Sequence, residues 1–194
     1  MANTDAAFGL VPFGTTDGSD YHGKIREVEF VTGDSVACFL GDAVKLTGTT
    51  GTDGFTPVVA QAAAGDSIVG VIVGFSPDFE NESFINAGSN RLASTSRKAQ
   101  VCFGSDVLYV AQEDSDSGAL VAADAGKNID IVVAAGSTVT GVSGMELDSS
   151  SALQASGQFR LHHVQNKLDN ELGANAQWVV SINENQDDHG AGVA

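Results

Sequence analysis

Residues 57–75 read PVVAQAAAGDSIVGVIVGF, and they show the kind of segment from which most of the chain is built. From Ile68 to Phe75 the side chains are almost continuously apolar and rich in β-branched residues, which predicts a strand buried on both faces. The small residues before the Gly65-Asp66 turn suggest a single helical turn. The segment as a whole therefore indicates a core built from strands.

Shorter segments of the same kind lie on both sides of this one. KIREVEFVTGD alternates polar and apolar side chains like a half-exposed strand, and SVACFLGDAVKLTG predicts two strands around a Gly-Asp turn. Further strands are expected in QVCFGSDVLYVAQ, NIDIVVAAG, STVTGVSGMELD, QFRLHHVQ and AQWVVSIN. No segment sustains a helical apolar period over more than about a dozen residues. The predicted fold class is mainly β, a barrel or sandwich of short strands with an extended N-terminal arm.

Composition suggests how the chain is divided. Residues 1–20 are expected to form the arm, residues 21–184 a β domain and residues 185–194 a polar C-terminal tail. A length of 194 residues suits one such domain and permits a sizeable core. Hydrophobic residues make up 42% and charged residues 18%, which indicates a folded chain rather than a disordered one.

The charge balance argues against several classes of partner. The chain has 25 Asp and Glu residues against 9 Lys and Arg, a formal net charge of −16. Such a surface repels nucleic acid and anionic membranes, because phosphate binding depends on Lys and Arg. No segment approaches the roughly 18 continuous apolar residues of a membrane span. We therefore expect no nucleic-acid partner and no membrane partner, and an acidic surface that faces solvent.

Two Gly-Asp-Ser motifs are the strongest hint of catalysis, because Gly-Asp-Ser-Leu begins one class of lipolytic hydrolases with Ser as the nucleophile. The motifs end at Ser35 and Ser67, and neither continues to Leu. That class also needs alternating helices and an Asp-x-x-His near the C-terminus, whereas Gln186 stands three residues before His189. Gly-Asp pairs between strands are typical of turns, where Gly supplies a positive φ. We therefore expect turns at both motifs and no enzyme activity.

The histidines do not predict a metal site. His162 and His163 are adjacent in an expected strand, so strict alternation would place them on opposite faces. His163 would then share a face with Phe159 and Leu161. Zinc would need more Cys or His at chelating spacing. We expect ordinary surface or hydrogen-bonded histidines.

The acidic and thiol side chains also fall short of a metal or cofactor site. Asp114 and Asp116 resemble the start of a calcium loop, but Ala125 occupies the position of the closing bidentate Glu. A solvated turn is the favoured interpretation, with adventitious calcium as the alternative. Cys38 and Cys102 stand in apolar runs, which favours free buried thiols over a disulfide or a reactive role. No phosphate loop, dinucleotide fingerprint or Cys-x-x-Cys is present, so no cofactor is expected.

The N-terminal stretch MANTDAAFGLVPFG combines apolar side chains with helix-breaking residues and contains no Lys or Arg. It lacks the basic n-region and continuous apolar run of a secretory signal, so we expect it to remain on the mature chain. Leaving its apolar side chains exposed costs on the order of 1.5–3 kcal/mol each. The arm either folds back onto its own barrel or reaches a neighbouring subunit, where it could add as an edge strand. The second alternative gives a partner-binding set of Phe8, Leu10, Val11, Pro12 and Phe13.

Three stretches together resemble small structural proteins of tailed bacteriophages. They are the opening MANTDAAFGLVPFG, the segment GDAVKLTG…AAAGDSIVGVIVGF and the C-terminal FRLHHVQNKLDNELGANAQWVVSINENQ. The last contains an Asp-Asn-x-x-Gly loop from Asp169 to Gly173 before a final strand. These matches cover roughly half of the chain. The family indicated is the head decoration (cement) proteins, which coat an assembled capsid and clamp neighbouring subunits.

The resemblance implies a virion structural protein, without enzyme activity, that lies on the outer capsid surface and occupies the host cytoplasm during assembly. Its implied partners are the major capsid protein and other copies of the chain in a homotrimer. The acidic composition agrees with the outside of a particle rather than its DNA-lined interior. Another virion component (a head fibre base, a tail protein or the major shell subunit) stays open as an alternative. A hydrolase or a cell-surface binding module has less support.

Overall fold

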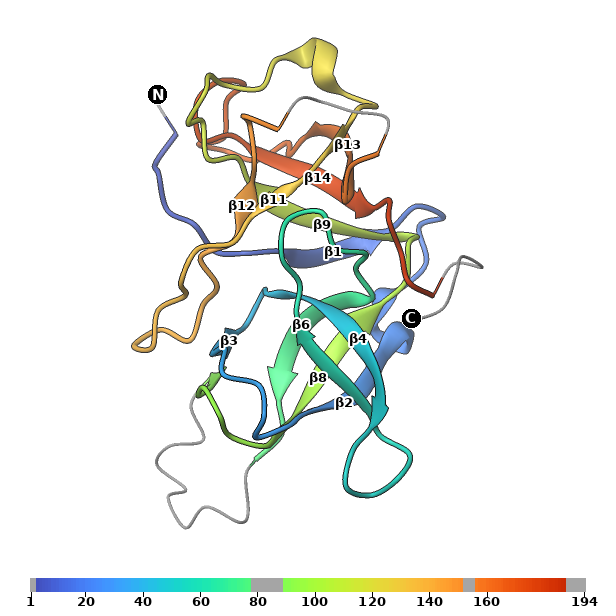
Figure 1. Cartoon of the computed structure of the whole chain (residues 1–194). Helices are drawn as coiled ribbons and strands as arrows, with labels where there is room; N and C mark the ends of the chain where they lie inside the picture. Colours follow the sequence, from blue (N-terminus) through green and yellow to red (C-terminus); the bar gives the residue numbers. More distant parts are fainter. Residues whose placement is uncertain (1–2, 78–88, 152–155, 188–194) are drawn as a thin grey trace.

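The computed structural model describes residues 3–77, 89–151 and 156–187, and the mainly β prediction is confirmed. A closed five-stranded barrel and a five-stranded antiparallel sheet make up the two parts of the molecule, with the sheet above the barrel in Figure 1. Within the described ranges the helical elements are the short 3-10 helices η1 (Tyr21–Lys24) and η3 (Ala122–Asp124). The short strands, which are separated by glycine-containing turns, thus include a closed barrel instead of forming a sandwich alone.

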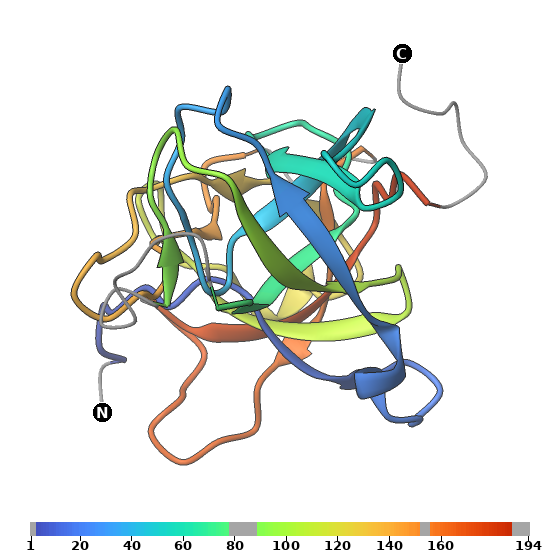
Figure 2. The same cartoon turned by 90° about the horizontal axis from the view of Figure 1, so that it is seen from below.

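The barrel closes in the order β2-β5-β4-β6-β8, and Figure 2 shows it from below. Its strands are β2 (Ile25–Phe30), β4 (Ala43–Thr50), β5 (Pro57–Gln61), β6 (Gly70–Phe75) and β8 (Arg97–Phe103). Neighbouring strands are antiparallel except β2 and β5, which meet in parallel at Glu29 and Val58. Alternate side chains of these strands form an apolar cluster that includes Val28, Phe30, Val44, Val59, Ile72, Ala99, Val101 and Phe103.

The second part is an antiparallel sheet in the order β1-β9-β14-β13-β10, so that β1 and β10 are its edges. Its strands are β1 (Val11–Thr15), β9 (Val107–Gln112), β14 (Gln177–Ile182), β13 (Phe159–Val164) and β10 (Asn128–Ile129). Two short pairs complete the described strands: β3 (Cys38–Phe39) with β7 (Asn90–Arg91), and β11 (Ile131–Val132) with β12 (Glu146–Leu147).

The barrel and the sheet share one apolar core. Ala43, Val71 and Cys102 are out of step with the side chains inside the barrel, so they point outward from it. There they join a buried cluster with Tyr109 and Trp178 of the sheet. The Tyr109 hydroxyl donates a hydrogen bond to the Cys102 carbonyl oxygen at 3.0 Å. This contact ties β9 to β8 across the junction.

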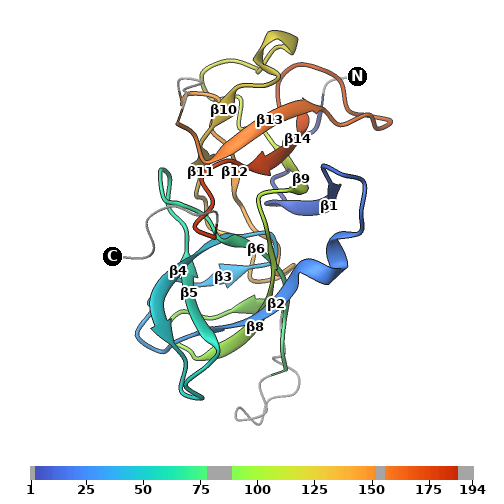
Figure 3. The same cartoon turned by 90° about the vertical axis from the view of Figure 1, so that its right-hand side faces the viewer.

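The two faces of the sheet differ in what covers them. The inner face packs against the barrel and against Ile131 and Leu147 of the β11–β12 pair, which belong to the same cluster. We call the opposite side the outer face. One row of paired residues crosses it through four neighbouring strands: Val11, Val110, Val179 and His163. Figure 3 shows β13, β14, β9 and β1 beside one another above the barrel.

Two of the secondary-structure predictions were wrong. The small residues before Gly65 form a turn instead of a helical turn, because the Asp66 carboxylate accepts a hydrogen bond from the Ala63 amide at 2.7 Å. The strand expected in STVTGVSGMELD is reduced to β12. The residues before it form a loop in which the Gly141 amide donates to the Ser137 carbonyl at 2.7 Å.

The start of the predicted C-terminal tail lies against the barrel. The Leu46 amide donates to Gln186 Oε1 at 2.6 Å, and Asp187 lies 3.7 Å from Arg26. Residues 188–194 lie outside the described residues. So do residues 78–88, most of the stretch SPDFENESFINAGSN, whose composition predicts a surface loop. Residues 152–155 of SSSALQASG, a stretch that predicts a short helix or a loop, also lie outside them.

Candidate functional site

The N-terminal segment lies along its own chain instead of extending away from it. The Asn3 side chain hydrogen-bonds the backbone of the β13–β14 loop, near the N-terminus in Figure 1. The Ala6 amide then donates to Gln112 Oε1 at 2.9 Å. Residues Val11–Thr15 follow as β1, paired with β9. Of the two alternatives for the arm, the described residues of the single chain show the one in which it folds back, because pairing with a sheet edge buries apolar surface that a free arm would expose.

In the single chain Leu10 is a core residue. Its side chain is 1% exposed and belongs to the cluster shared by the barrel and the sheet. Its amide donates to the Gly41 carbonyl at 2.9 Å. Gly9 precedes it with φ +71°, a conformation that glycine adopts without strain, and passes close to Ser143 and Gly41. This turn of the backbone directs Leu10 inward.

The rest of the predicted set stays at the surface of the edge strand. Val11 is 46% exposed and Phe13 is 56% exposed, while Phe8 and Pro12 are half-buried. A register shift between Pro12 and Gly14 leaves Phe13 without an opposite residue in β9. The bulge and the missing N–H of Pro12 make the free edge of β1 a poor template for another strand. A partner would therefore contact β1 through its side chains more than through its backbone.

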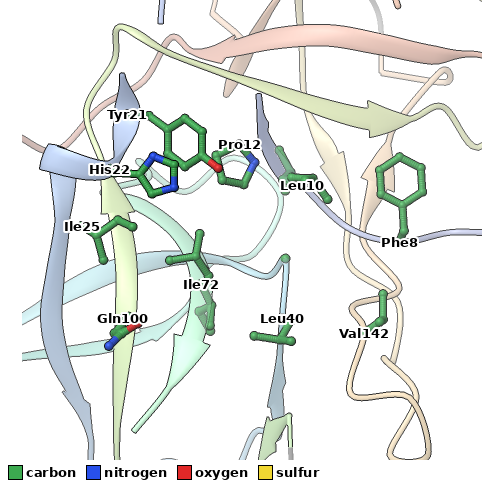
Figure 4. A pocket seen from close by; sticks show the side chains of 13 residues that line it. Phe8, Leu10, Pro12, Tyr21, His22, Ile25, Leu40, Ile72, Gln100 and Val142 are labelled. Carbon is green, nitrogen blue, oxygen red and sulfur yellow. The ribbon is translucent and has the colours of Figure 1, made fainter. Parts of the chain in front are cut away.

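Two hollows lie on either side of β1. The first has a volume of about 470 Å³ and is lined by Phe8, Leu10, Val11, Pro12, Tyr21, His22, Ile25, Leu40, Gly41, Ile72, Val73, Gln100 and Val142. Figure 4 shows Tyr21, His22 and Ile25 at one end of it and Phe8 and Val142 at the other. Apolar side chains with a few polar groups are typical of a binding hollow of this size.

The polar end of the first hollow is held by a local network. The Tyr21 and His22 rings stack with their centroids 4.4 Å apart. The His22 amide donates to Asp20 Oδ1 at 3.0 Å, and the same carboxylate contacts the His22 ring. The backbone hydrogen bond from His22 is the main reason that the pKa of Asp20 is lowered. This network fixes the aromatic pair at the rim of the hollow.

The second hollow lies towards the outer face and has a volume of about 270 Å³. Its lining shares Phe8, Val11 and Pro12 with the first hollow and adds Phe13, Val110, Gln165, Lys167 and Gln177. Val11 and Pro12 therefore lie between two hollows, and we call Val11 to Phe13 the apolar ridge. Gln165 Oε1 is buried without a hydrogen-bond partner in the described structure.

A bulge in β13 overturns the predicted alternation of its side chains. The register shifts between Leu161 and His163, so that His163 pairs with Val179 on the outer face. Val164 packs against the shared core instead. His162 also approaches the outer face, where its Nε2 lies 2.9 Å from the Ser181 hydroxyl. Within the described residues, no histidine belongs to a group of three candidate metal ligands.

Residues 149–168 contain no Asp or Glu although the chain has 25 of them, and the sequence predictions missed this signal. The same stretch contains Arg160, His162, His163 and Lys167. Three of these four side chains are exposed, and His162 is half-buried. Together they form what we call the basic strip, which extends along β13 and into the loop that follows it. The gap in acidic residues is the feature of the sequence that indicates this strip.

The two Gly-Asp-Ser motifs form turns, and their serines are exposed. The Asp34 carboxylate accepts from the Val36 amide at 3.0 Å and pairs with Arg91 at 3.1 Å. Gly65 has the expected positive φ, whereas Gly33 does not, so that detail of the prediction was wrong for the first motif. Among the described residues, neither Ser35 nor Ser67 is hydrogen-bonded to a histidine; His189 lies outside them.

A third carboxylate, which the sequence did not indicate, lies beside the acidic turn. Asp148 joins Asp114 and Asp116, and single carboxylate oxygens of all three lie within 4.8 Å of one another. The Ser149 amide and hydroxyl both donate to Asp114 Oδ1, at 3.0 and 2.7 Å. Ala125, at the position of the closing calcium ligand, is exposed. These hydrogen bonds fit the expected turn, and we assign the cluster no ligand.

Both cysteines are buried free thiols, as expected. Burial raises the pKa of the Cys38 thiol to about 12, with the nearby Asp42 adding to the effect. Burial also raises the pKa of Cys102. Because the thiolate is the reactive form, neither side chain is a nucleophile at neutral pH.

No protein-family model, curated protein or solved structure matches this chain. In the part of the chain that the structure describes, no helix has the length and apolar character to cross a membrane. We therefore infer the function of the site from its own side chains. An apolar ridge between two hollows suits binding of another macromolecule, and the described residues around it include no paired nucleophile and base.

Proposed function

We propose that this protein is a virion structural protein that decorates the outside of a phage capsid and stabilises it by bridging neighbouring capsid subunits. One observation carries the proposal: a chain of net charge −16 presents an exposed apolar ridge, Val11 to Phe13, on an edge strand flanked by two hollows. Apolar surface of this kind, set among polar residues, marks an interaction site. The resemblance of three stretches to head decoration proteins supports a capsid subunit as the class of partner.

The energetics of the ridge require a larger interface around it. About half of Val11 and of Phe13 is still exposed, so covering both side chains contributes about 2 kcal/mol. Association costs roughly 4–15 kcal/mol in lost freedom of motion. A specific interface therefore needs the two hollows and their rims as well, with a total buried area near the usual value of about 1,600 Å².

Bridging explains how such a contact would stabilise a shell. A ligand that binds the assembled lattice better than separated subunits shifts the equilibrium towards the lattice by mass action. A modest gain per site is multiplied over many sites on the capsid. The proposed partners are accordingly the major capsid protein and, in a homotrimer, further copies of this chain. The acidic remainder of the surface would face solvent.

Capsids that lack this protein provide the test. We expect the wild-type protein to co-sediment with them and to raise the temperature at which they release DNA. The variant Val11→Asp/Phe13→Asp should lose at least about tenfold in affinity, because it places charge in the apolar contact. Phe55→Asp is the matched control, since Phe55 is 80% exposed on a barrel loop away from β1.

Three results would count against the proposal. Wild-type protein that does not bind the capsids would exclude decoration. Equal binding by the β1 variant and the Phe55 variant would exclude β1 as the attachment site. Labelled protein found on the tail or a head fibre would favour another virion component instead.

A further inference from the structure

The strands of the five-stranded sheet carry no acidic residue. Their sequences are VPFGT, VLYVAQ, QWVVSI, FRLHHV and NI, in which Arg160 is the single Asp, Glu, Lys or Arg residue. Arg160 is exposed, and in the register of the sheet it lies in a row with Ser181 and Leu108. The strands of the sheet therefore contribute one cation and no carboxylate to the outer face.

Among the described residues, Arg160 and Lys167 also differ from the other Lys and Arg residues in having no ion-pair or hydrogen-bond partner. Neither side chain makes an ion pair or a hydrogen bond within the described residues. Arg97 donates to backbone carbonyl groups. The remaining Lys and Arg residues all form ion pairs with carboxylates of the same chain: Lys24, Arg26, Lys45, Arg91, Lys98 and Lys127. The two unpaired cations thus belong to one stretch of chain and stand at the two ends of the basic strip.

The basic strip is continuous with the apolar ridge. Lys167 lines the second hollow together with Val11 and Phe13. His163 is in the same cross-strand row as Val11, through Val110 and Val179. The loop that carries Lys167 extends from the molecule on the side of β1 in Figure 2. A partner seated on the ridge would therefore also reach the strip.

We infer that the outer face receives a carboxylate-bearing protein segment, whose apolar side chains enter the hollows beside β1 and whose Asp or Glu side chains pair with Arg160 and Lys167. The inference rests on the proposed function and adds the chemistry of the partner. A protein of net charge −16 repels an acidic partner over most of its surface, so unpaired cations fix where and in which orientation such a partner can dock.

A protein segment fits this face better than a nucleic acid does. Nucleic-acid sites use several Lys and Arg residues along the phosphate backbone, and their affinity rises with each one. Here two unpaired cations stand beside an apolar ridge, and the surrounding surface is acidic. The contact is therefore expected to depend on salt only modestly, as an interface with a few charge pairs at its rim does.

The experiment compares Arg160→Gln/Lys167→Gln with Arg26→Gln, an exposed cation of the barrel, on capsids that lack the protein. We expect the double variant to bind about tenfold more weakly at 50 mM NaCl and the difference to shrink at 500 mM NaCl. The control should bind like the wild type. Circular dichroism checks that each variant is folded.

A cross-linking measurement tests the chemistry directly. A carbodiimide joins an amine to a carboxylate in contact with it, so mass spectrometry of wild-type protein on the capsid should find Lys167 linked to an Asp or Glu of a shell subunit. Equal binding by the double variant, with no Lys167 cross-link, would overturn this inference and leave the proposed function standing. Failure of the wild type to bind the capsid would overturn both. Binding of a 20-base-pair DNA duplex that depends on Arg160 and Lys167 would overturn the assignment of a protein partner.

Discussion

Replacing Leu10 with alanine should lower the free energy of unfolding by about 3 kcal/mol. Leu10 is 1% exposed and lies in the apolar cluster that joins the barrel to the sheet. Truncation of a buried leucine removes its transfer free energy and leaves a cavity, and measured costs run from about 2 to 5 kcal/mol. For a chain of this length, the loss corresponds to a decrease in melting temperature of about 6–12 °C.

Urea unfolding followed by tryptophan fluorescence suits this measurement. Trp178 is the single tryptophan, is 1% exposed, and belongs to the same cluster as Leu10. Leu168→Ala is the matched control, because Leu168 is 87% exposed and should change the free energy by less than about 0.5 kcal/mol. Val11→Ala should cost less than about 1 kcal/mol, since nearly half of that side chain is already in contact with water.

Capsid binding tests the exposed residues of β1. Folded Val11→Ala/Phe13→Ala protein is expected to bind capsids more weakly than the wild type, whereas the prediction for Leu10→Ala concerns the free energy of unfolding alone. A cost below about 1 kcal/mol for Leu10→Ala, or a similar cost for Leu168→Ala, would refute the placement of Leu10 in the shared core. It would also restore the alternative in which the N-terminal arm reaches a neighbouring subunit.

Three further variants test separate features. Gly9→Ala should destabilise by at least about 2 kcal/mol in urea unfolding, because φ is +71° and the new Cβ would lie 2.5 Å from the Ser143 Cβ. Gly18→Ala, with φ +78° and open space around the new Cβ, should cost only about 1 kcal/mol. Equal costs for the two variants would contradict the close approach of Gly9 to Ser143. Burial raises the pKa of Glu146, with Asp5 and Asp114 adding to it, so its ionisation opposes folding at neutral pH. Glu146→Gln should therefore raise the free energy of unfolding by about 0.5 kcal/mol at pH 7, and the gain should vanish as pH falls towards about 4 and the wild-type carboxyl is protonated; a gain independent of pH would contradict this cause. Iodoacetamide should leave Cys38 unmodified in the folded protein at pH 8 and modify it in urea, and rapid modification of the folded form would show that the thiol is accessible.

The barrel could be predicted because its signals are local. The apolar run that ends at Phe75 forms β6, and the strands expected in QVCFGSDVLYVAQ are β8 and β9. The order of strands could not be predicted, since the sheet joins β1 and β9 to β14 and β13 from distant parts of the chain. Such pairings depend on tertiary packing, which no short window of sequence contains.

The candidate site was predicted in part. Leu10 and Val11 are both aliphatic and adjacent in the sequence, so composition alone could not separate the buried residue from the exposed one. Their difference depends on the positive φ at Gly9 and on the pairing of β1 with β9. The bulge in β13 likewise moved His163 outward and Val164 inward, because one extra residue reverses the side chains that follow it.

The most direct measurement is a cryo-electron-microscopy structure of capsids carrying this protein. We predict that Val11 and Phe13 lie within about 4 Å of shell-subunit side chains, with the two hollows beside β1 filled. Phe55, on its barrel loop, should face solvent. A decorated capsid in which Val11 and Phe13 face solvent, while the barrel contacts the shell, would contradict the assignment of this face as the attachment site.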